Sequence, residues 1–264
     1  MAKLYTLFSG SSGNSTYIGS NNDTGILIDA GRSAKQIENA LSTFNINSKR
    51  IQAIFVTHEH TDHIKGIKVL ASRYNIPVYS SMGTIKAMEE MNILNGKFKY
   101  GVIDEKGICI GGMFIVPFRT SHDSRESVGY KIRTQDYKEI VIAMDIGVVS
   151  DDVRHALNGC DLAVIESNHD INMLKSGSYP YFLKRRILSS TGHLSNDDCA
   201  KELPDLVRSG VKKFILAHLS SENNVENLAL ATAVCSLNAH NMKKGIDFDI
   251  SVAPKEMCCG AVVI

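Results

Sequence analysis

The stretch IQAIFVTHEHTDHIKG, Ile51–Gly66, decides the fold. Its first half is an apolar run that is typical of a buried strand. Its second half places four potential metal ligands directly after that strand: His58, His60, Asp62 and His63. Side chains two residues apart in an extended backbone point to the same side. We therefore expect an extended chain from His58 to Asp62, with these three side chains converging, and we expect His63 at the start of the next helix.

Such a cluster of ionisable groups is expensive to bury without a partner. A divalent cation removes that cost, because it accepts the lone pairs of neutral imidazoles and carboxylates. A lone His-x-His pair on a surface carries little information. Four candidate ligands between an apolar strand and an amphipathic helix are much rarer, so the stretch predicts a metal site. Glu59 points the other way by alternation, and we expect it to have a structural role.

Three further candidate ligands also follow apolar runs. His122 comes after FIVPFRTS, Asp145 after IVIAM, and His218 after KFILA. One such residue alone is an ordinary polar strand end. Three of them, in a chain that already carries the cluster, indicate that several strands bring ligands to one edge of a sheet.

The pattern along the chain predicts an α/β protein. Short runs rich in β-branched and aromatic residues predict strands at 3–9, 15–20, 24–31, 50–56, 78–81, 160–167, 212–220 and 247–253. Helical spacing predicts helices at 33–44, 64–74, 84–93, 151–159, 181–189, 196–210 and 224–239. In the middle we expect a hairpin at 107–118 that turns at Gly111-Gly112, and a strand pair at 127–134 and 139–147. We expect one domain, residues 1–264, made of two similar halves whose sheets pack face to face with helices outside.

The composition limits the function classes. With 264 residues and 44% hydrophobic residues, the chain can build a sizeable core. Its 29 Lys and Arg nearly balance its 28 Asp and Glu, so any grip on a polyanion must be local. The six cysteines form no C-x-x-C pair, which favours a reducing compartment. We expect no signal peptide and no bilayer-spanning run, and therefore a cytoplasmic protein that does not bind a membrane.

H-x-H-x-D-H followed by distant His, Asp and His resembles the metallo-β-lactamase superfamily. That resemblance implies a four-layer αββα sandwich, which matches the two halves expected above. The ligand sets that it implies are His58, His60 and His122 for one metal, and Asp62, His63 and His218 for a second, with Asp145 bridging. Because His60 occupies the second ligand position rather than an acid, the resemblance does not extend to the flavodiiron oxidoreductases.

Two such metals define the chemistry. We expect divalent ions, Zn²⁺ or Mn²⁺ with Fe²⁺ as an alternative, because His/Asp sites accept each of them. Their charge, less that of Asp62 and Asp145, leaves about +2. A water between two such ions loses a proton near neutral pH and becomes a nucleophile. Phosphodiesters fit this positive site best, while thioesters and lactams remain open, and Asp62 counts among the catalytic residues.

Cleavage of a phosphodiester also requires a proton for the departing oxygen. His193 lies in the polar loop SSTGHLSNDD, and Glu166 ends the strand DLAVIE and would orient it. This pairing resembles the Glu and His pair of ribonuclease Z-like phosphodiesterases. The alternative is that His193 only caps the next helix beside Ser195. His169 is predicted to contact substrate, with contact to a metal or packing at a helix end as alternatives.

The loop SGSSGNS, Ser9–Ser15, offers backbone N–H groups and hydroxyls to a phosphate, although a plain turn is the alternative. Together with THEHTDHIKG, ESNHD, GHLSN and LAHLSSENN in this order, it resembles the YycJ/WalJ branch of the superfamily. That resemblance implies a cytoplasmic nuclease that trims double-stranded DNA from its 5′ end. The loop residues that we predict to bind substrate are Ser11, Ser12 and Asn14. There is no room between Asp145 and His193 for the cap domain of β-CASP nucleases.

The first hypothesis is therefore a metal-dependent phosphodiesterase, most simply a DNA exonuclease. A small-molecule hydrolase of thioesters, lactones or cyclic phosphodiesters is the alternative, and a protein that keeps metal only for folding is a third. Basic residues occur at Lys184-Arg185-Arg186, at Lys212-Lys213, and at Arg119 and Arg125. They are either solvated surface or phosphate contacts. The choice between DNA and RNA, the physiological metal and the oligomeric state stay open.

Overall fold

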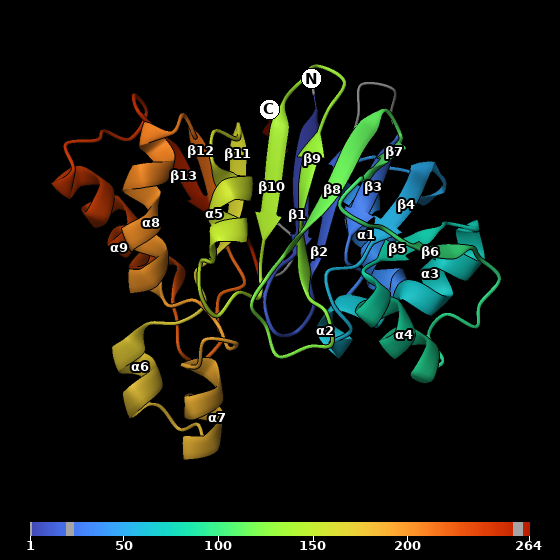
Figure 1. Cartoon of the computed structure of the whole chain (residues 1–264), viewed down its shortest axis with the longest axis horizontal. Helices are drawn as coiled ribbons and strands as arrows, with labels where there is room; N and C mark the ends of the chain where they lie inside the picture. The colour runs from blue at the N-terminus through green and yellow to red at the C-terminus, as the bar shows by residue number, and fades with distance from the viewer. Residues whose placement is uncertain (1, 20–23, 256–260) are drawn as a thin grey trace. The chain divides into compact units, whose positions relative to one another are not determined.

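The computed structural model (Figure 1) divides into two compact units. Residues 2–19, 24–255 and 261–264 are described. The first unit comprises the chain up to Pro117, Ser124–Lys138 and the segment from Pro254. The second unit comprises Phe118–Asp123 and Glu139–Ala253. The expectation of a single domain over 1–264 remains a prediction.

The first unit contains a seven-stranded sheet. Its strands, in sheet order, are β14 (Val262–Val263), β1 (Lys3–Phe8), β2 (Ser15–Gly19), β3 (Gly25–Ile28), β4 (Ile51–Phe55), β5 (Val78–Ser80) and β6 (Tyr100–Val102). The first four strands pair antiparallel, and β3 to β6 pair parallel. The helices of this unit are α1 (Ala34–Thr43), the 3₁₀ turn η1 (Ser48–Arg50), α2 (Thr61–Ile64), α3 (Ile67–Tyr74) and α4 (Met82–Glu90).

Helix α1 shows why this unit folds as the sequence predicts. Ser33 and Gln36 form a capping box that satisfies two N–H groups at its start. Its apolar stripe, Ile37 and Leu41, is fully buried together with Leu70 of α3 in one core cluster with the sheet. Burying each such side chain contributes about 1.5–3 kcal/mol. This packing holds β3 and β4 with their carboxyl ends aligned.

The predicted hairpin is confirmed. Strands β7 (Ile108–Ile110) and β8 (Met113–Arg119) pair antiparallel, with Ile110 opposite Met113. Gly111 and Gly112 form the turn with φ of 60° and 76°, and a two-residue turn with positive φ at both positions requires residues such as glycine. Strand β9 (Val128–Arg133) follows in the same unit.

The second unit contains four parallel strands in the order β10, β11, β12, β13. Their bounds are β10 (Glu139–Ala143), β11 (Leu162–Glu166), β12 (Lys213–Ala217) and β13 (Asp249–Val252). The helices are α5 (Asp151–Leu157), α6 (Ile171–Ser176), α7 (Tyr181–Ile187), α8 (Asn196–Arg208) and α9 (Glu226–Ala239). In Figure 1, α8 and α9 lie beside the strands, while α6 and α7 project from the rest of this unit.

Two local predictions are wrong. The predicted helix 64–74 is two helices, because the chain kinks at Lys65–Gly66 between α2 and α3. The chain is also not extended through Asp62, because α2 already begins at Thr61 after the extended residue His60. Among the described residues, no helix is both long and apolar enough to cross a bilayer.

Candidate metal centre

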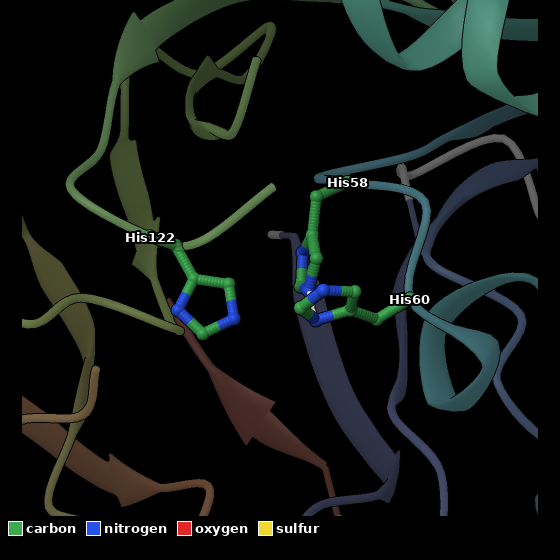
Figure 2. Close-up of side chains that lie close together, drawn as sticks. All are labelled: His58, His60 and His122. Atoms are coloured by element: carbon green, nitrogen blue, oxygen red, sulfur yellow. Dashed lines mark hydrogen bonds between the residues drawn. The ribbon is translucent and has the colours of Figure 1, made fainter. Parts of the chain in front are cut away.

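His58 and His60 follow β4, and their rings lie against each other (Figure 2). The Nε2 atom of His58 is 3.0 Å from the Nδ1 atom of His60, and the ring centroids are 4.5 Å apart. Two imidazole nitrogens on one tetrahedral zinc lie about 3.3 Å apart at the usual Zn–N length. The predicted convergence of these two side chains is therefore present, at a spacing that one cation would bridge.

Asp62 lies beside His63, but on a helical turn and not on the extended chain that we predicted. It lies in the single turn of α2, where its Oδ2 is 3.5 Å from Nε2 of His63. The backbone of this turn is held by Asn14, whose N–H donates to the Asp62 carbonyl at 2.8 Å. A side chain on Gly31 would collide with that same carbonyl oxygen. The local fold thus depends on close backbone contact with the β3 end and with the loop after β1.

Asp29 is a site residue that the sequence interpretation missed. Its carboxylate is fully buried and lies 2.8 Å from Nδ1 of His63. It also accepts hydrogen bonds from the N–H and the hydroxyl of Thr57 at 2.8 and 2.9 Å. The Thr57 hydroxyl oxygen then lies 3.0 Å from Nδ1 of His58. The signal was available, because Asp29 ends the apolar run GILID as Asp145 ends IVIAMD.

The predicted substrate loop has a buried part and an exposed part. Asn14 is fully buried, and its amide lies 3.3 Å from Oδ2 of Asp62 and 3.0 Å from Nε2 of His63. Ser11 and Ser12 are exposed, and Arg32 donates a hydrogen bond to the Ser12 hydroxyl at 2.8 Å. Asn14 therefore positions the Asp62 and His63 side chains, whereas the two serines are accessible to a ligand.

Glu59 has the structural role that alternation predicts. Its carboxylate accepts a hydrogen bond from the backbone N–H of Arg125 at 2.7 Å, and Oε2 lies 3.4 Å from the Thr84 hydroxyl. These contacts tie the loop after β4 to α4 and to the start of the 124–138 segment.

In the second unit, the ends of β10, β11 and β12 and one loop bring together a set that we call the Glu166 cluster. Its members, Asp145, Glu166, His193 and His218, each place a potential ligand atom within 4.8 Å of the others. Glu166 is fully buried at its centre. Its Oε1 lies 2.8 Å from Nδ1 of both His193 and His218. Its Oε2 accepts hydrogen bonds from the N–H groups of Ile146 and Leu194 at 2.7 and 3.3 Å.

These contacts shift the pKa values of the pair. Burial alone would raise the pKa of Glu166, but the charge and hydrogen bond of His193 and the hydrogen bond of His218 lower it to about 2. Burial opposes protonation of His193, yet the charge and hydrogen bond of Glu166, with Asp145, raise its pKa above the ordinary value. The His193 side chain is 15% exposed, against 2% for His218 and 0% for Glu166. His193 is therefore the member of this pair of imidazoles that a substrate can reach.

His122 lies in the segment after β8, and Figure 2 labels it with the two histidines of the first unit. Its Nδ1 lies 3.0 Å from the carbonyl oxygen of Gly192. Its Nε2 is 3.8 Å from Oδ1 of Asp145, which is also 3.4 and 3.3 Å from Nδ1 of His193 and His218. Within the second unit, Asp145 is thus surrounded by three imidazoles.

Three buried site residues have a left-handed backbone. The φ angles of Asp29, Asp145 and His218 are 61°, 53° and 58°, and each residue follows the end of a strand. Such a conformation costs about 1–3 kcal/mol for a residue other than glycine and is common at functional sites. The turn redirects each side chain at the carboxyl end of its strand.

His169, predicted to contact substrate, is 1% exposed on the segment after β11. Within the described part of the chain, neither of its ring nitrogens has a hydrogen-bond partner. Burial lowers the pKa of His169 to about 4, so the ring is neutral. Substrate contact by this residue remains a prediction.

The donor set fits divalent metal ions. A carbonyl or carboxylate can only accept, so the Nδ1 atoms of His63, His122, His193 and His218 carry the proton and donate it. Each of these rings therefore presents the lone pair of Nε2 on its opposite side. Metal-binding histidines show this pattern, in which an acceptor on the second nitrogen fixes the tautomer and orients the ring.

Known proteins share this architecture. Residues 24–219 match the family described as "Beta-lactamase superfamily domain". Exodeoxyribonuclease YycJ of Bacillus anthracis is 39% identical over 247 residues, which cover 92% of each chain. The chain belongs to this superfamily, in its YycJ/WalJ group. Exodeoxyribonuclease WalJ of Streptococcus pneumoniae serotype 2 is 39% identical over 251 residues, covering 94% of this chain and 93% of that one.

A solved structure agrees. The metallo-β-lactamase fold protein YhfI of Bacillus subtilis superposes with a TM-score of 0.74 at 16% identity, covering 97% of this chain and 98% of that one. The predicted αββα fold class, the family and the enzyme class, a metal-dependent hydrolase, are thereby confirmed. The His and Asp clusters have donor atoms close enough together to hold divalent metal ions.

Replacing Asp29 with Asn tests the metal site through a residue that does not bind metal itself. The amide of Asn can donate to Nδ1 of His63, which would release the tautomer that presents Nε2. We expect metal affinity to fall about 10–100-fold in a metal titration of the metal-free protein. Asp104→Asn, at an exposed position, is the matched control. Equal affinity of wild type and Asp29→Asn would contradict the assigned tautomer.

Proposed function

We propose that this chain is a metal-dependent exodeoxyribonuclease that degrades double-stranded DNA from its 5′ end. The observation that carries the proposal is the 39% identity, over more than nine-tenths of the chain, to two relatives named exodeoxyribonucleases. The donor chemistry supports it, because imidazoles and carboxylates without a thiolate suit the metals of phosphodiesterases. Of these two observations, the identity to the exodeoxyribonucleases is the one that favours nucleic acid over the thioester, lactone or cyclic phosphodiester substrates of the alternative.

We propose two metal positions. In this assignment His58, His60 and His122 hold one ion, Asp62, His63 and His218 hold the other, and Asp145 bridges them. Support comes from the Nδ1 partners of His63, His122 and His218, which leave Nε2 as the ligand atom. When bound, divalent ions such as Zn²⁺, Mn²⁺ or Fe²⁺ supply positive charge to a phosphate and lower the pKa of water that attacks it.

The chain's own contribution to the chemistry centres on His193. Its Nδ1 proton is held by Glu166, so Nε2 is the atom that exchanges a proton with substrate. The Glu166 carboxylate favours the protonated form of His193, which would supply a proton to the departing oxygen. Glu166 has both oxygens occupied by hydrogen bonds, so in this proposal it acts by orienting His193 and His218.

Substrate binding by the loop after β1 is part of the proposal. Ser11 and Ser12 are exposed, and Arg32, which contacts Ser12, adds a positive charge that suits a phosphate. Asn14 holds the loop against Asp62, and His169 remains a candidate substrate contact. A DNA substrate agrees with the predicted cytoplasmic location.

End-labelled duplexes test the polarity. With Mn²⁺ or Zn²⁺, we expect a 5′ label to be released at once as a mononucleotide or very short product. A 3′-labelled strand of the same duplex should shorten step by step, as measured on denaturing gels. Asp145→Ala should abolish both reactions, because it removes the carboxylate that lies among three imidazoles of the second unit.

The matched control is Asp151→Ala, an exposed carboxylate on α5 of the same unit. It should leave both reactions unchanged. Immediate release of the 3′ label would reverse the proposed polarity. An intact duplex with every metal, combined with turnover of thioesters or lactones, would establish the small-molecule alternative.

His193→Gln tests proton donation. We expect kcat on DNA to fall about 10²–10⁴-fold, the usual contribution of a positioned acid. On thymidine 5′-(p-nitrophenyl phosphate) the loss should be much smaller, because p-nitrophenolate leaves without a proton. His155→Gln, at an exposed position on α5, is the control. Equal losses on both substrates, with unchanged metal content, would show that His193 has another role.

A further inference from the structure

The segment from α6 to the loop after α7 is a basic island. Residues 171–196 contain Lys175, Lys184, Arg185 and Arg186 and no Asp or Glu, a formal charge of +4. Since the whole chain has a formal charge of +1, the remaining residues carry −3. A local positive field therefore exists here although the protein as a whole is nearly neutral, and it favours an anionic partner.

Two large aromatic side chains of the basic island are exposed to solvent. Tyr181 and Phe182, the first residues of α7, are 77% and 74% exposed. Residues three and four apart on a helix are neighbours, so Arg185 lies on the same face as both aromatics. We call Tyr181, Phe182 and Arg185 the aromatic face of α7. Figure 1 shows α7 projecting with α6 from the rest of the second unit.

The side chains of the three consecutive basic residues of α7 make different contacts. The Lys184 ammonium donates to the carbonyls of Lys175 and Gly177 at 2.8 and 2.7 Å, and thus joins α7 to the end of α6. Arg186 forms a two-pronged ion pair with Asp123. Arg185 is exposed, and no described residue forms an ion pair with it. Of the three, Arg185 is the one left for a ligand.

Helix α7 is firmly attached to catalytic candidates of its own unit. Its Arg186 holds Asp123, the neighbour of His122. The loop that follows α7 accepts hydrogen bonds from the His122 segment: the Ser190 carbonyl from the Ser121 hydroxyl, the Thr191 carbonyl from the Asp123 N–H, and the Gly192 carbonyl from His122. The same loop carries His193, whose N–H donates to the Ile187 carbonyl at 3.0 Å. The aromatic face is thus rigidly connected to His122 and His193.

We propose that the aromatic face of α7 binds the frayed end of the DNA duplex beside the cleavage site, with its separated bases stacked on Tyr181 and Phe182 and a phosphate on Arg185. Exposed aromatics beside unpaired basic groups are the usual platform for unpaired bases. This inference rests on the proposed nuclease function and assigns a surface that binds its substrate. Seven helical residues span about 10 Å, which is about three nucleotide steps at 3.4 Å each. Helix α7 is therefore long enough to contact about three nucleotides of the strand.

The charge argues for DNA over a protein partner. Tyr, Phe and Arg are also enriched at protein interfaces, so the argument for DNA is the charge of +4 in a segment that contains no carboxylate. A second copy of the chain would bring the same +4 segment against itself in a two-fold contact, which is repulsive.

The test compares a long and a short substrate. In the double variant Tyr181→Ala/Phe182→Ala, we expect KM for a 20-base-pair duplex to rise at least about tenfold with kcat within about twofold. Kinetics on thymidine 5′-(p-nitrophenyl phosphate), too short to reach α7, should not change. Phe182→Leu keeps an apolar side chain without a π-face, and it should also raise KM for the duplex. Arg185→Gln should reduce the slope of log KM against log salt by about one.

Tyr137→Ala, an 82% exposed tyrosine of the first unit, is the matched control and should behave as wild type. Unchanged duplex kinetics in the double variant would overturn the inference, and so would equal losses on both substrates, which would mean damage at His193. Anisotropy of labelled DNA on inactive metal-free protein separates the two proposals. If the double variant loses DNA binding but the wild type cleaves no DNA, the proposed α7 binding surface would be supported and the proposed nuclease activity would be refuted. A wild-type dimer that the double variant converts to monomer, with duplex KM unchanged, would assign the face to self-association.

Discussion

A histidine presents one ring nitrogen to a metal when the other is already committed as a hydrogen-bond donor. In this protein, buried acceptor oxygens fix the proton on Nδ1 of several histidines. Asp29 holds His63, Gly192 holds His122, and Glu166 holds His193 and His218. The acceptors are carboxylates or carbonyls that cannot donate, so the tautomer does not depend on a metal being present. In the proposed function, the ligand positions and proton donation by His193 both depend on these bonds.

Strand ends position two of these acceptors, Asp29 and Glu166, and also the site residues Asp145 and His218. Asp29, Asp145 and His218 leave strands β3, β10 and β12 through a left-handed residue, and Glu166 ends β11 directly. The strain of these turns is about 1–3 kcal/mol each. It is offset by burial, because the strands behind them are closely packed apolar runs. Hydrogen bonds also connect the basic island to the site, because the loop after α7 is hydrogen-bonded to the His122 segment.

The periodicity of the sequence predicts most elements, because amphipathic helices such as α1 and buried strands such as β4 leave strong patterns. It misses β6 and α6, which are short and partly exposed and thus lack a pattern. The candidate ligands could be predicted from their place after apolar runs. The helical turn at Asp62 could not, because it depends on backbone contacts with Asn14 and Gly31 that are distant in sequence. Asp29 carried the same signal as Asp145, but its contact with His63 is long-range.

The tautomers of the metal-free protein test this arrangement most directly. Two-bond ¹H–¹⁵N correlation spectra distinguish imidazoles protonated at Nδ1 from those protonated at Nε2. We expect His63, His122 and His218 to carry their proton on Nδ1 before any metal is added. Protonation of these rings on Nε2 in the metal-free protein would contradict the proposal that Asp29, Gly192 and Glu166 prepare the site.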